Sequence, residues 1–270
     1  MKGRIAHRWE QLAAVGRKAL VPYVTPEYPL RDATVPVLKA LDDAGADMIE
    51  VGIPYSDPIA DGPTIQLSSE VALRNGATIP TILDAVRRFR QERELPILLM
   101  GYVNPILRMG LEVFVRQSSA AGVDGLIIPD LPPEEARELI DVAARHRMSL
   151  VFLIARTTAD ARIRMIDSLS TDFSYCVSMT GVTGMRPGMA HRDELDGYLQ
   201  RVRRSVSKRF VVGFGISTTE QVAAVWRHAD GAVVGSALLK AMAPARSAGQ
   251  AATLGADFFA SLRPKEPHHV

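Results

Sequence analysis

Residues 46–66 read ADMIEVGIPYSDPIADGPTIQ, a short apolar strand that runs into a loop rich in proline, glycine and aspartate. Side chains alternate across a strand, so Glu50 lies on the face opposite Ile49 and Val51 and points toward the inside of the sheet. Burying an unpaired carboxylate is costly or raises its pKa. Glu50 is therefore a candidate catalytic group, with an ion pair to an arginine at the strand end as the alternative.

The loop that follows this strand is predicted to be ordered. Its prolines restrict the backbone, Gly62 allows a positive φ, and Asp57 and Asp61 can accept hydrogen bonds from nearby backbone N–H groups. The loop thus places two carboxylates, Glu50 and Asp61, around a rigid turn. This arrangement indicates an active-site loop.

Short apolar strands and helical patterns alternate along the chain without a linker. The expected strands span 20–24, 46–52, 96–102, 123–128, 149–154, 173–178, 210–214 and 231–234. The expected helices span 5–15, 31–44, 79–92, 111–121, 133–146, 159–170, 193–204 and 218–227, with two more after Ser236. Strict alternation favours a parallel sheet, and eight units favour an α/β fold, a closed (β/α)8 TIM barrel with an extra N-terminal helix. A dinucleotide-binding fold is disfavoured, because no G-x-G-x-x-G follows the first strand.

The composition is that of an ordinary globular protein. Of the 270 residues, 47% are hydrophobic and 23% are charged, and the formal net charge is +2. We expect one barrel domain over 1–262, followed by a polar, proline-containing and disordered tail at 263–270. The sequence has no long apolar run and no secretory signal, which predicts a cytoplasmic protein that does not bind a membrane.

Metal ions and nucleic acids are both disfavoured as ligands. The chain has one cysteine and six histidines, which do not follow a metal-ligand spacing. The arginine-rich segments 87–90 and 201–204 lie on helical patterns without interleaved aromatic residues, which is typical of solvated helix faces. We expect no metal site and no nucleic-acid partner.

Glycine-rich turns follow the last three expected strands. The turn 213–217 reads GFGIS after the seventh strand, and Gly235 and Ser236 open a helix after the eighth. Glycines let a backbone approach an anion and a helix N-terminus directs N–H groups at it, so the two turns together predict a barrel phosphate site. Either turn alone would be read as an ordinary cap. The segment 178–188 after the sixth strand predicts a lid that closes over a substrate and supplies an N–H group from Gly184.

Three motifs occur in order: EVGIPYSDPIADGPTIQ at 50–66, GVTG at 181–184 and GFGIS at 213–217. In this order and spacing they resemble the tryptophan synthase α-subunit family, and the resemblance covers nearly the whole chain. It implies retro-aldol cleavage of indole-3-glycerol phosphate to indole and glyceraldehyde 3-phosphate, without a cofactor. It also implies a tryptophan synthase β subunit as the partner in an α2β2 complex, with residues 56–58 lying toward that subunit.

The resemblance implies a role for each matching residue. Glu50 would be the general acid/base that protonates the indole ring carbon and deprotonates the C3′ hydroxyl, and Asp61 would accept the indole N–H. One carboxyl group of raised pKa can perform both proton transfers in turn. Tyr175 would lie near the catalytic glutamate, and Thr183 would contact Asp61 when the lid closes. The indole pocket would be lined by Tyr23, Leu99, Ile127 and Leu153, and the phosphate site by Gly184, Gly213, Gly235 and Ser236.

Two positions depart from the family pattern and leave an alternative open. Glu27 stands where glycine is common after the first strand, and Arg156 stands where proline is common after the fifth. The chain could therefore be a stand-alone indole-3-glycerol phosphate lyase of a specialised pathway. A sugar-phosphate isomerase or aldolase would need a lysine or a histidine at a strand end, which we do not find. A non-catalytic phosphate-binding barrel subunit could have lost Glu50 or Asp61, whereas both are present.

Overall fold

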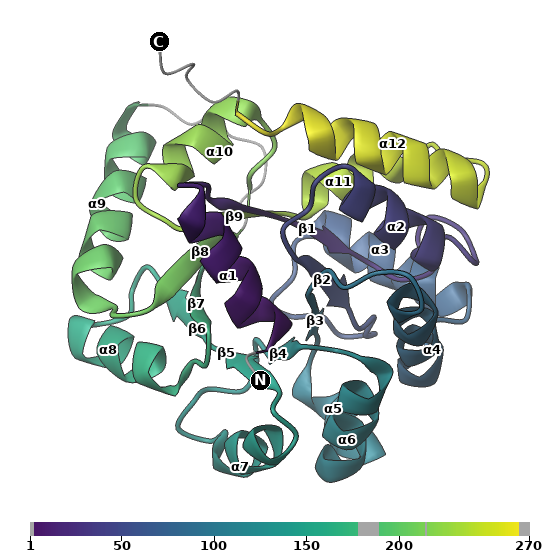
Figure 1. Cartoon of the computed structure of the whole chain (residues 1–270), viewed down its shortest axis with the longest axis horizontal. Helices are drawn as coiled ribbons and strands as arrows, with labels where there is room; N and C mark the ends of the chain where they lie inside the picture. The colour runs from purple at the N-terminus through teal and green to yellow at the C-terminus, as the bar shows by residue number, and fades with distance from the viewer. Residues whose placement is uncertain (1–2, 178–188, 214, 265–270) are drawn as a thin grey trace.

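A computed structural model describes residues 3–177, 189–213 and 215–264, and within 189–193 it describes the backbone alone. In these parts nine parallel strands form one sheet in the order β5-β4-β3-β2-β1-β9-β8-β7-β6. The strands are β1 Ala19–Val24, β2 Ile49–Gly52, β3 Ile97–Met100, β4 Gly125–Ile127, β5 Ser149–Val151, β6 Leu153–Ala155, β7 Phe173–Val177, β8 Arg209–Gly213 and β9 Gly231–Val234. They lie at the centre of the molecule with helices around them (Figure 1).

The two ends of the strand order meet, which closes the barrel. Only Phe152 separates β5 from β6, and its carbonyl accepts the N–H of Tyr175 in β7 at 3.1 Å. Together β5 and β6 correspond to the single expected strand at 149–154. The predicted TIM barrel is therefore confirmed, with its fifth strand divided at Phe152.

Twelve helices lie in the described parts of the chain. They are α1 Arg4–Ala14, α2 Thr34–Asp43, α3 Pro63–Arg74, α4 Ile79–Arg90, α5 Val103–Met109, α6 Leu111–Ala121, α7 Arg137–Arg145, α8 Asp160–Leu169, α9 Met189–Ser205, α10 Thr219–Trp226, α11 Ser236–Met242 and α12 Ala248–Ser261. Helix α1 crosses one end of the barrel (Figure 1), where Ile5, Trp9 and Leu12 are buried. This agrees with the predicted extra N-terminal helix.

Two helices are not expected from the sequence, α3 and α5. The stretch that begins at Pro63 has the composition of a loop, but proline is compatible with the first turn of a helix, where its missing N–H is not needed. Helix α5 is short and begins directly after Tyr102. Both helices follow strands at the same end of the barrel and lie next to the loop that carries Asp61.

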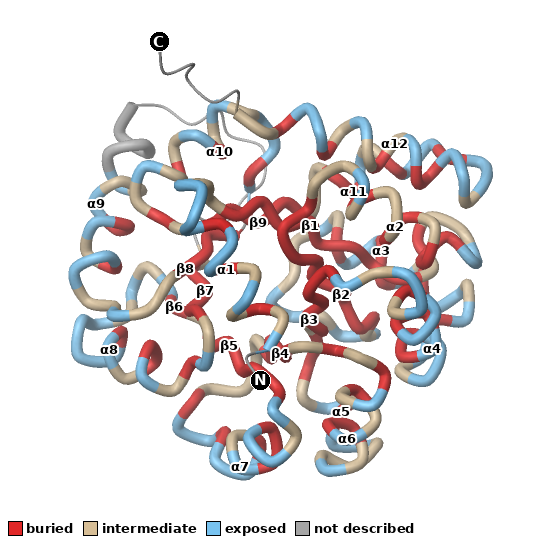
Figure 2. The backbone as a smooth tube through the Cα atoms, viewed as in Figure 1, coloured by how far each residue is buried: buried red, intermediate tan, exposed pale blue. Residues whose placement is uncertain are grey.

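The strand register separates residues that face the barrel interior from those that face the helices. Glu50 is opposite Tyr23 on one side and Leu98 on the other, and Gly52 is opposite Met100. Partners in a parallel ladder point to the same face of the sheet. Tyr23, Glu50 and Met100 therefore share the inner face. Most strand residues are buried (Figure 2), as expected for a parallel sheet covered by helices, although Ala155 at the end of β6 is exposed.

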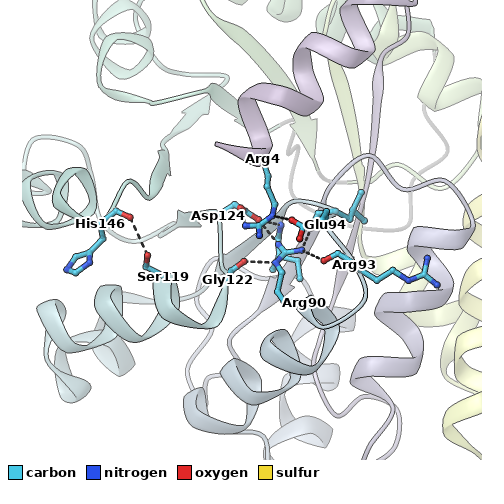
Figure 3. A network of polar contacts seen from close by, with 10 residues as sticks. Arg4, Arg90, Arg93, Glu94, Ser119, Gly122, Asp124 and His146 are labelled. Carbon is cyan, nitrogen blue, oxygen red and sulfur yellow. Dashed lines mark hydrogen bonds and ion pairs between the residues drawn. The ribbon is translucent and has the colours of Figure 1, made fainter. Parts of the chain in front are cut away.

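Aspartates at the N-terminal ends of the strands bind the backbone of neighbouring strands. Asp124 accepts the N–H of Ile97 at 2.8 Å, and the guanidinium groups of Arg90 and Arg4 bond to the same carboxylate at 2.6 and 3.1 Å (Figure 3). Asp230 accepts the N–H of Phe210 at 3.0 Å in the same way. Each carboxylate precedes one strand and holds a neighbouring one, which fixes how the strands are aligned at this end.

Asp47 is a third aspartate of this kind. Its ion pairs connect residues near the two ends of the chain. It is fully buried, accepts the N–H of Leu20 at 2.8 Å, and pairs with Arg8 of α1 and with Arg263, each at 2.9 Å. Arg263 also donates to the carbonyl of Gly45 at 2.6 Å. The packed structure thus includes Arg263, the first residue of the tail that the sequence predicts to be disordered.

Candidate active site

A pocket opens at the C-terminal ends of the strands and brings together residues from both halves of the chain. It is lined by Tyr23, Glu50, Asp61, Ile65, Met100, Tyr175, Gly215, Val233, Gly235 and Ser236. Active sites of TIM barrels lie at this end, because the loops after all eight strands converge there. Half of the site residues predicted from the sequence therefore line one pocket, although they are far apart along the chain: Tyr23, Glu50, Asp61, Tyr175, Gly235 and Ser236.

Glu50 projects from β2 into this pocket and is 1% exposed. Its Oε2 atom has no hydrogen-bond partner in the described part of the chain, so the alternative of an arginine ion pair is not what the structure shows. Burial raises the pKa of Glu50 from its ordinary value to about 8. The carboxyl group therefore carries a proton at neutral pH and can act as an acid.

Asp61 lies on the loop between β2 and α3, and its side chain lines the same pocket. The loop is held in a turn by hydrogen bonds from the Asp61 N–H to the Pro58 carbonyl at 3.0 Å and from Gln66 Nε2 to the Asp61 carbonyl at 2.9 Å. Burial raises the pKa of Asp61 to about 6, and a hydrogen bond from Tyr102 opposes that rise. Asp61 is thus ionised at neutral pH, where Glu50 is protonated.

Two buried tyrosines, Tyr23 and Tyr175, flank Glu50. Burial raises the pKa of each hydroxyl far above its ordinary value, and the nearby Glu50 contributes in the same direction, so both hydroxyls are neutral. Glycines make room for them. A Cβ atom on Gly52 would lie 2.2 Å from the Tyr23 hydroxyl, and one on Gly213 would lie 1.9 Å from the Tyr175 hydroxyl. Tyr175 therefore requires a glycine at position 213, independently of any ligand that the backbone binds there.

The apolar wall differs at one position from the prediction. Met100 lines the pocket and is opposite Gly52 and Ile127, whereas Leu99 is opposite Val51 and lies on the outer face. The prediction that Leu99 lines the pocket is wrong. Ile127 shares the inner face with Met100, and Leu153, opposite Tyr175, shares it with that tyrosine.

The expected anion-binding side of the pocket is only partly described. Gly235 and Ser236 line the pocket where α11 begins, and Gly215 lines it with a positive φ of 80° that favours glycine. Thr183, Gly184 and the rest of the predicted lid at 178–188 lie outside the described residues, as does Phe214. The lid and its contact with Asp61 therefore stay predictions.

Comparison with known proteins agrees with this geometry. A family model described as tryptophan synthase alpha chain matches residues 9–259. The chain belongs to the tryptophan synthase alpha chain family. Its relatives include the tryptophan synthase alpha chains of Pelodictyon phaeoclathratiforme, 48% identical over 95% of this chain and 99% of that protein, and of Prosthecochloris aestuarii, 50% identical over 92% and 95%.

Solved structures of the same family have the same fold. Tryptophan synthase subunit alpha from Legionella pneumophila superposes with a TM-score of 0.88 at 34% identity and covers 97% of this chain and 98% of its own. A chain of the tryptophan synthase complex from Pyrococcus furiosus gives a TM-score of 0.81 at 38% identity, covering 90% of this chain and 97% of its own. Structural similarity thus extends over the barrel and its extra helix.

The two departures from the pattern of this tryptophan synthase family have structural explanations. Glu27 has a positive φ of 58°, and its carboxylate accepts hydrogen bonds from the N–H of Asp32 and the hydroxyl of Thr34, at the start of α2. An acidic group is favourable at a helix N-terminus. Arg156 pairs with Glu194 of α9 at 2.9 Å. Neither Glu27 nor Arg156 lines the pocket, so neither changes the groups available for chemistry.

Several residues of the site are not identifiable from the sequence. Met100, Ile65 and Val233 line the pocket, and the Tyr102 hydroxyl contacts the Asp61 loop. Strand alternation at 96–102 divides this segment into two faces, but it does not say which face is the inner one. Ile65 belongs to the unexpected α3.

Among the described residues, no group of three or more histidine, cysteine, aspartate or glutamate side chains could hold a metal ion. None of the helices in those parts of the chain combines the length and apolar character that a membrane crossing requires.

Proposed function

We propose that this chain cleaves indole-3-glycerol phosphate to indole and glyceraldehyde 3-phosphate, as a carbon–carbon lyase. The observation that carries the proposal is the pair of carboxyl groups in one pocket with different protonation states. Glu50 is unpaired and has a pKa of about 8, whereas Asp61 has a pKa of about 6. Two titratable groups whose environments separate their pKa values are typical of acid–base catalysis.

The proposed reaction needs one proton donor, one base and one stabilising charge. Protonated Glu50 donates its proton to the indole ring carbon that bears the side chain, and ionised Asp61 accepts the indole N–H and stabilises the positive charge on the ring. The Glu50 carboxylate then takes the proton from the C3′ hydroxyl, the carbon–carbon bond breaks, and its electron pair restores the aromatic ring. The hydroxyl carbon becomes the aldehyde of glyceraldehyde 3-phosphate, so Glu50 regains its proton and the reaction balances without a cofactor.

The other pocket residues fit the two halves of this substrate. Met100 lines the pocket, and Ile127 and Leu153 lie on the same inner face, so that the three can supply an apolar surface for the indole ring, with Tyr23 and Tyr175 beside the catalytic glutamate. Gly215, Gly235 and Ser236 lie at the start of helices or turns, where backbone N–H groups can bind phosphate. We propose that Thr183 and Gly184 complete the site from the lid, and that Gly213 contributes chiefly by admitting Tyr175.

We also propose that a tryptophan synthase β subunit binds this chain in an α2β2 complex. One structural relative is a chain of the Pyrococcus furiosus tryptophan synthase complex. Residues 56–58, which the family resemblance places toward the β subunit, adjoin Ile59, whose side chain is 84% exposed. Leu107 of the neighbouring α5 is 56% exposed. Exposed apolar side chains near a binding loop are typical of a protein interface.

One assay tests the reaction and the partner together. Indole release from indole-3-glycerol phosphate is measured with the isolated chain and after addition of a β subunit, with Glu50→Gln as the matched variant. We expect slow release by the isolated chain, faster release in the complex and little from the variant. Full activity without any response to a β subunit would support a stand-alone lyase. No release in either condition would support a non-catalytic subunit.

A further inference from the structure

Tyr102 lies beside the Asp61 loop, although it is not among the residues that line the pocket. It is the N-cap of α5, two residues after the end of β3, and its side chain is buried. Its ring packs against that of Tyr55, with centroids 5.5 Å apart and planes tilted by 34°. Tyr55 is on the same loop as Asp61, so this contact already ties the loop to the end of β3.

The Tyr102 hydroxyl acts on two consecutive residues of the loop. It accepts the N–H of Ala60 at 2.9 Å, and it favours the ionised form of the neighbouring Asp61 carboxyl, whose pKa it lowers. A phenol has one proton to donate and lone pairs that accept, so it can accept one hydrogen bond and donate another at once. After the hydroxyl accepts the Ala60 N–H, its own proton is still available for the next residue of the loop, Asp61.

We propose that Tyr102 is a positioning residue, whose hydroxyl holds the Asp61 carboxylate in place by accepting the Ala60 N–H while donating to Asp61. This inference rests on the proposed function, in which Asp61 must be ionised and must face the indole N–H. Tyr102 itself touches the carboxylate and not the substrate. Its effect is to fix the direction of the charge and to favour the ionised form.

The surroundings of Asp61 explain why this one hydrogen bond matters. The neighbouring titratable groups are Tyr23 from β1, Glu50 from β2 and Tyr175 from β7, and none of them is a cation. Asp130, which lies near Tyr102 and accepts the N–H of Val103 at 2.9 Å, adds another acidic group. Burial opposes ionisation of Asp61, and within the described residues the Tyr102 hydrogen bond is the contact that favours it.

The test compares Tyr102→Phe with Tyr55→Phe in the full-length chain. Each variant loses one hydroxyl and keeps the ring, but the Tyr55 hydroxyl contacts Asn104 at 3.3 Å and not Asp61. The pKa of Asp61 is measured without substrate by 13C NMR titration of the side-chain carboxyl, with the signal assigned by its loss in Asp61→Asn. We expect Tyr102→Phe to raise that pKa by about one unit, since hydrogen bonds to charged groups are the strong ones. Tyr55→Phe should leave it unchanged.

A kinetic readout separates positioning from a merely structural effect. In Tyr102→Phe the acid limb of kcat/KM against pH should move to higher pH by the same amount, and kcat should fall more than KM rises, with kcat/KM lower by about tenfold at pH 7. An Asp61 pKa equal to that of the unmodified chain, in a folded Tyr102→Phe variant, would overturn the proposal. The titration needs no turnover, so a chain that never released indole would disprove the proposed function without deciding this inference.

A second variant covers the case in which Tyr102→Phe does not fold. Site-specific replacement of Tyr102 by 3-fluorotyrosine keeps the hydroxyl and makes it a stronger donor. The Asp61 pKa should then fall below that of the unmodified chain, the opposite direction to the phenylalanine variant. An unchanged or raised pKa in this variant would contradict the proposed hydrogen bond.

Discussion

The two ends of the barrel use buried carboxylates in opposite ways. At the N-terminal end, Asp47 and Asp124 are each paired with arginines and with the N–H of a strand. At the C-terminal end, Glu50 has an oxygen with no hydrogen-bond partner in the described chain, and burial raises its pKa to about 8. Paired carboxylates hold strands together, whereas an unpaired one in a buried pocket keeps a proton that it can transfer. Pairing thus separates the stabilising end of the barrel from the reactive end.

Replacing Glu50 by glutamine should cause the largest change. The amide keeps the size of the side chain but neither donates a proton to the ring carbon nor accepts one from the hydroxyl. We expect turnover to fall by at least the ~10²–10⁴ that is typical for loss of a general acid/base. Indole release under saturating substrate measures this, with circular dichroism as the check that the variant is folded. Near-normal turnover by a folded variant would remove Glu50 from the mechanism.

The same variant should not be less stable, in contrast to changes at the other end. The folded pKa of Glu50 is about 8 and its ordinary value is 4.5, so between these values the unfolded chain releases a proton that the folded chain keeps. The unmodified chain therefore loses stability as pH rises through this window. Glutamine does not titrate, so Glu50→Gln should unfold at a higher urea concentration than the unmodified chain at pH 8, and the difference should shrink toward pH 4.5. A variant that is less stable at pH 8 would contradict the unpaired state of Glu50.

Asp124→Asn should lower stability and leave the chemistry intact. The Arg90 side chain is only 9% exposed and would lose its charged partner, and breaking a buried pair costs roughly 3–5 kcal/mol. We expect about 3 kcal/mol, the lower end of that range, because the amide oxygen still accepts a hydrogen bond. Urea unfolding measures the loss. Asp84→Asn is the matched control, since Asp84 is 61% exposed beside Arg87 and should cost less than about 1 kcal/mol.

Turnover per folded molecule is the discriminating measurement for Asp124→Asn. It should equal that of the unmodified chain, because Asp124 lies at the end of the barrel away from the pocket. A large fall in turnover without unfolding would mean that the two ends are not independent.

Gly213→Ala should have an intermediate effect by displacing Tyr175. The new Cβ would lie 1.9 Å from the tyrosine hydroxyl, so the ring must move, and overpacking of a core typically costs about 1–3 kcal/mol. We expect lower turnover as well, because Tyr175 flanks Glu50. Gly249→Ala in α12 is the control, since no atom lies within 4 Å of the position that its new methyl group would take and alanine favours a helix. Equal turnover in both variants would show that the position of Tyr175 is unimportant.

The smallest effect concerns the pH dependence of kcat/KM in the unmodified chain. Asp61 must be ionised, which requires a pH above about 6, and Glu50 must be protonated, which requires a pH below about 8. A bell-shaped profile with its maximum between these values is therefore expected, falling about tenfold per unit outside the window. The two apparent pKa values belong to the pair of carboxyl groups together. A profile that still rises above pH 9 would contradict Glu50 as the acid.

The fold class and the two carboxylates of the pocket can be predicted from the chain alone. Strands and helices alternate because their apolar patterns repeat locally, and a buried glutamate followed by a proline- and glycine-restricted loop indicates chemistry before any packing is known. The glycines after the last strands likewise indicate close backbone approach. These features depend on spacing within short segments, which can be read directly from the chain.

Which residues meet around these two carboxylates depends on long-range packing. Met100 and not Leu99 faces the pocket, because the register with β2 selects one of two faces that alternation leaves equivalent. Tyr102 reaches Asp61 and Tyr175 requires Gly213 across long sequence separations. The pairing of Asp124 with Arg4 and Arg90, and the absence of a partner for Glu50 Oε2 within the described chain, also follow from packing. A carboxylate has the same chemistry at either end of the barrel, and its pKa is set by the charges and hydrogen-bond donors that the fold brings to it.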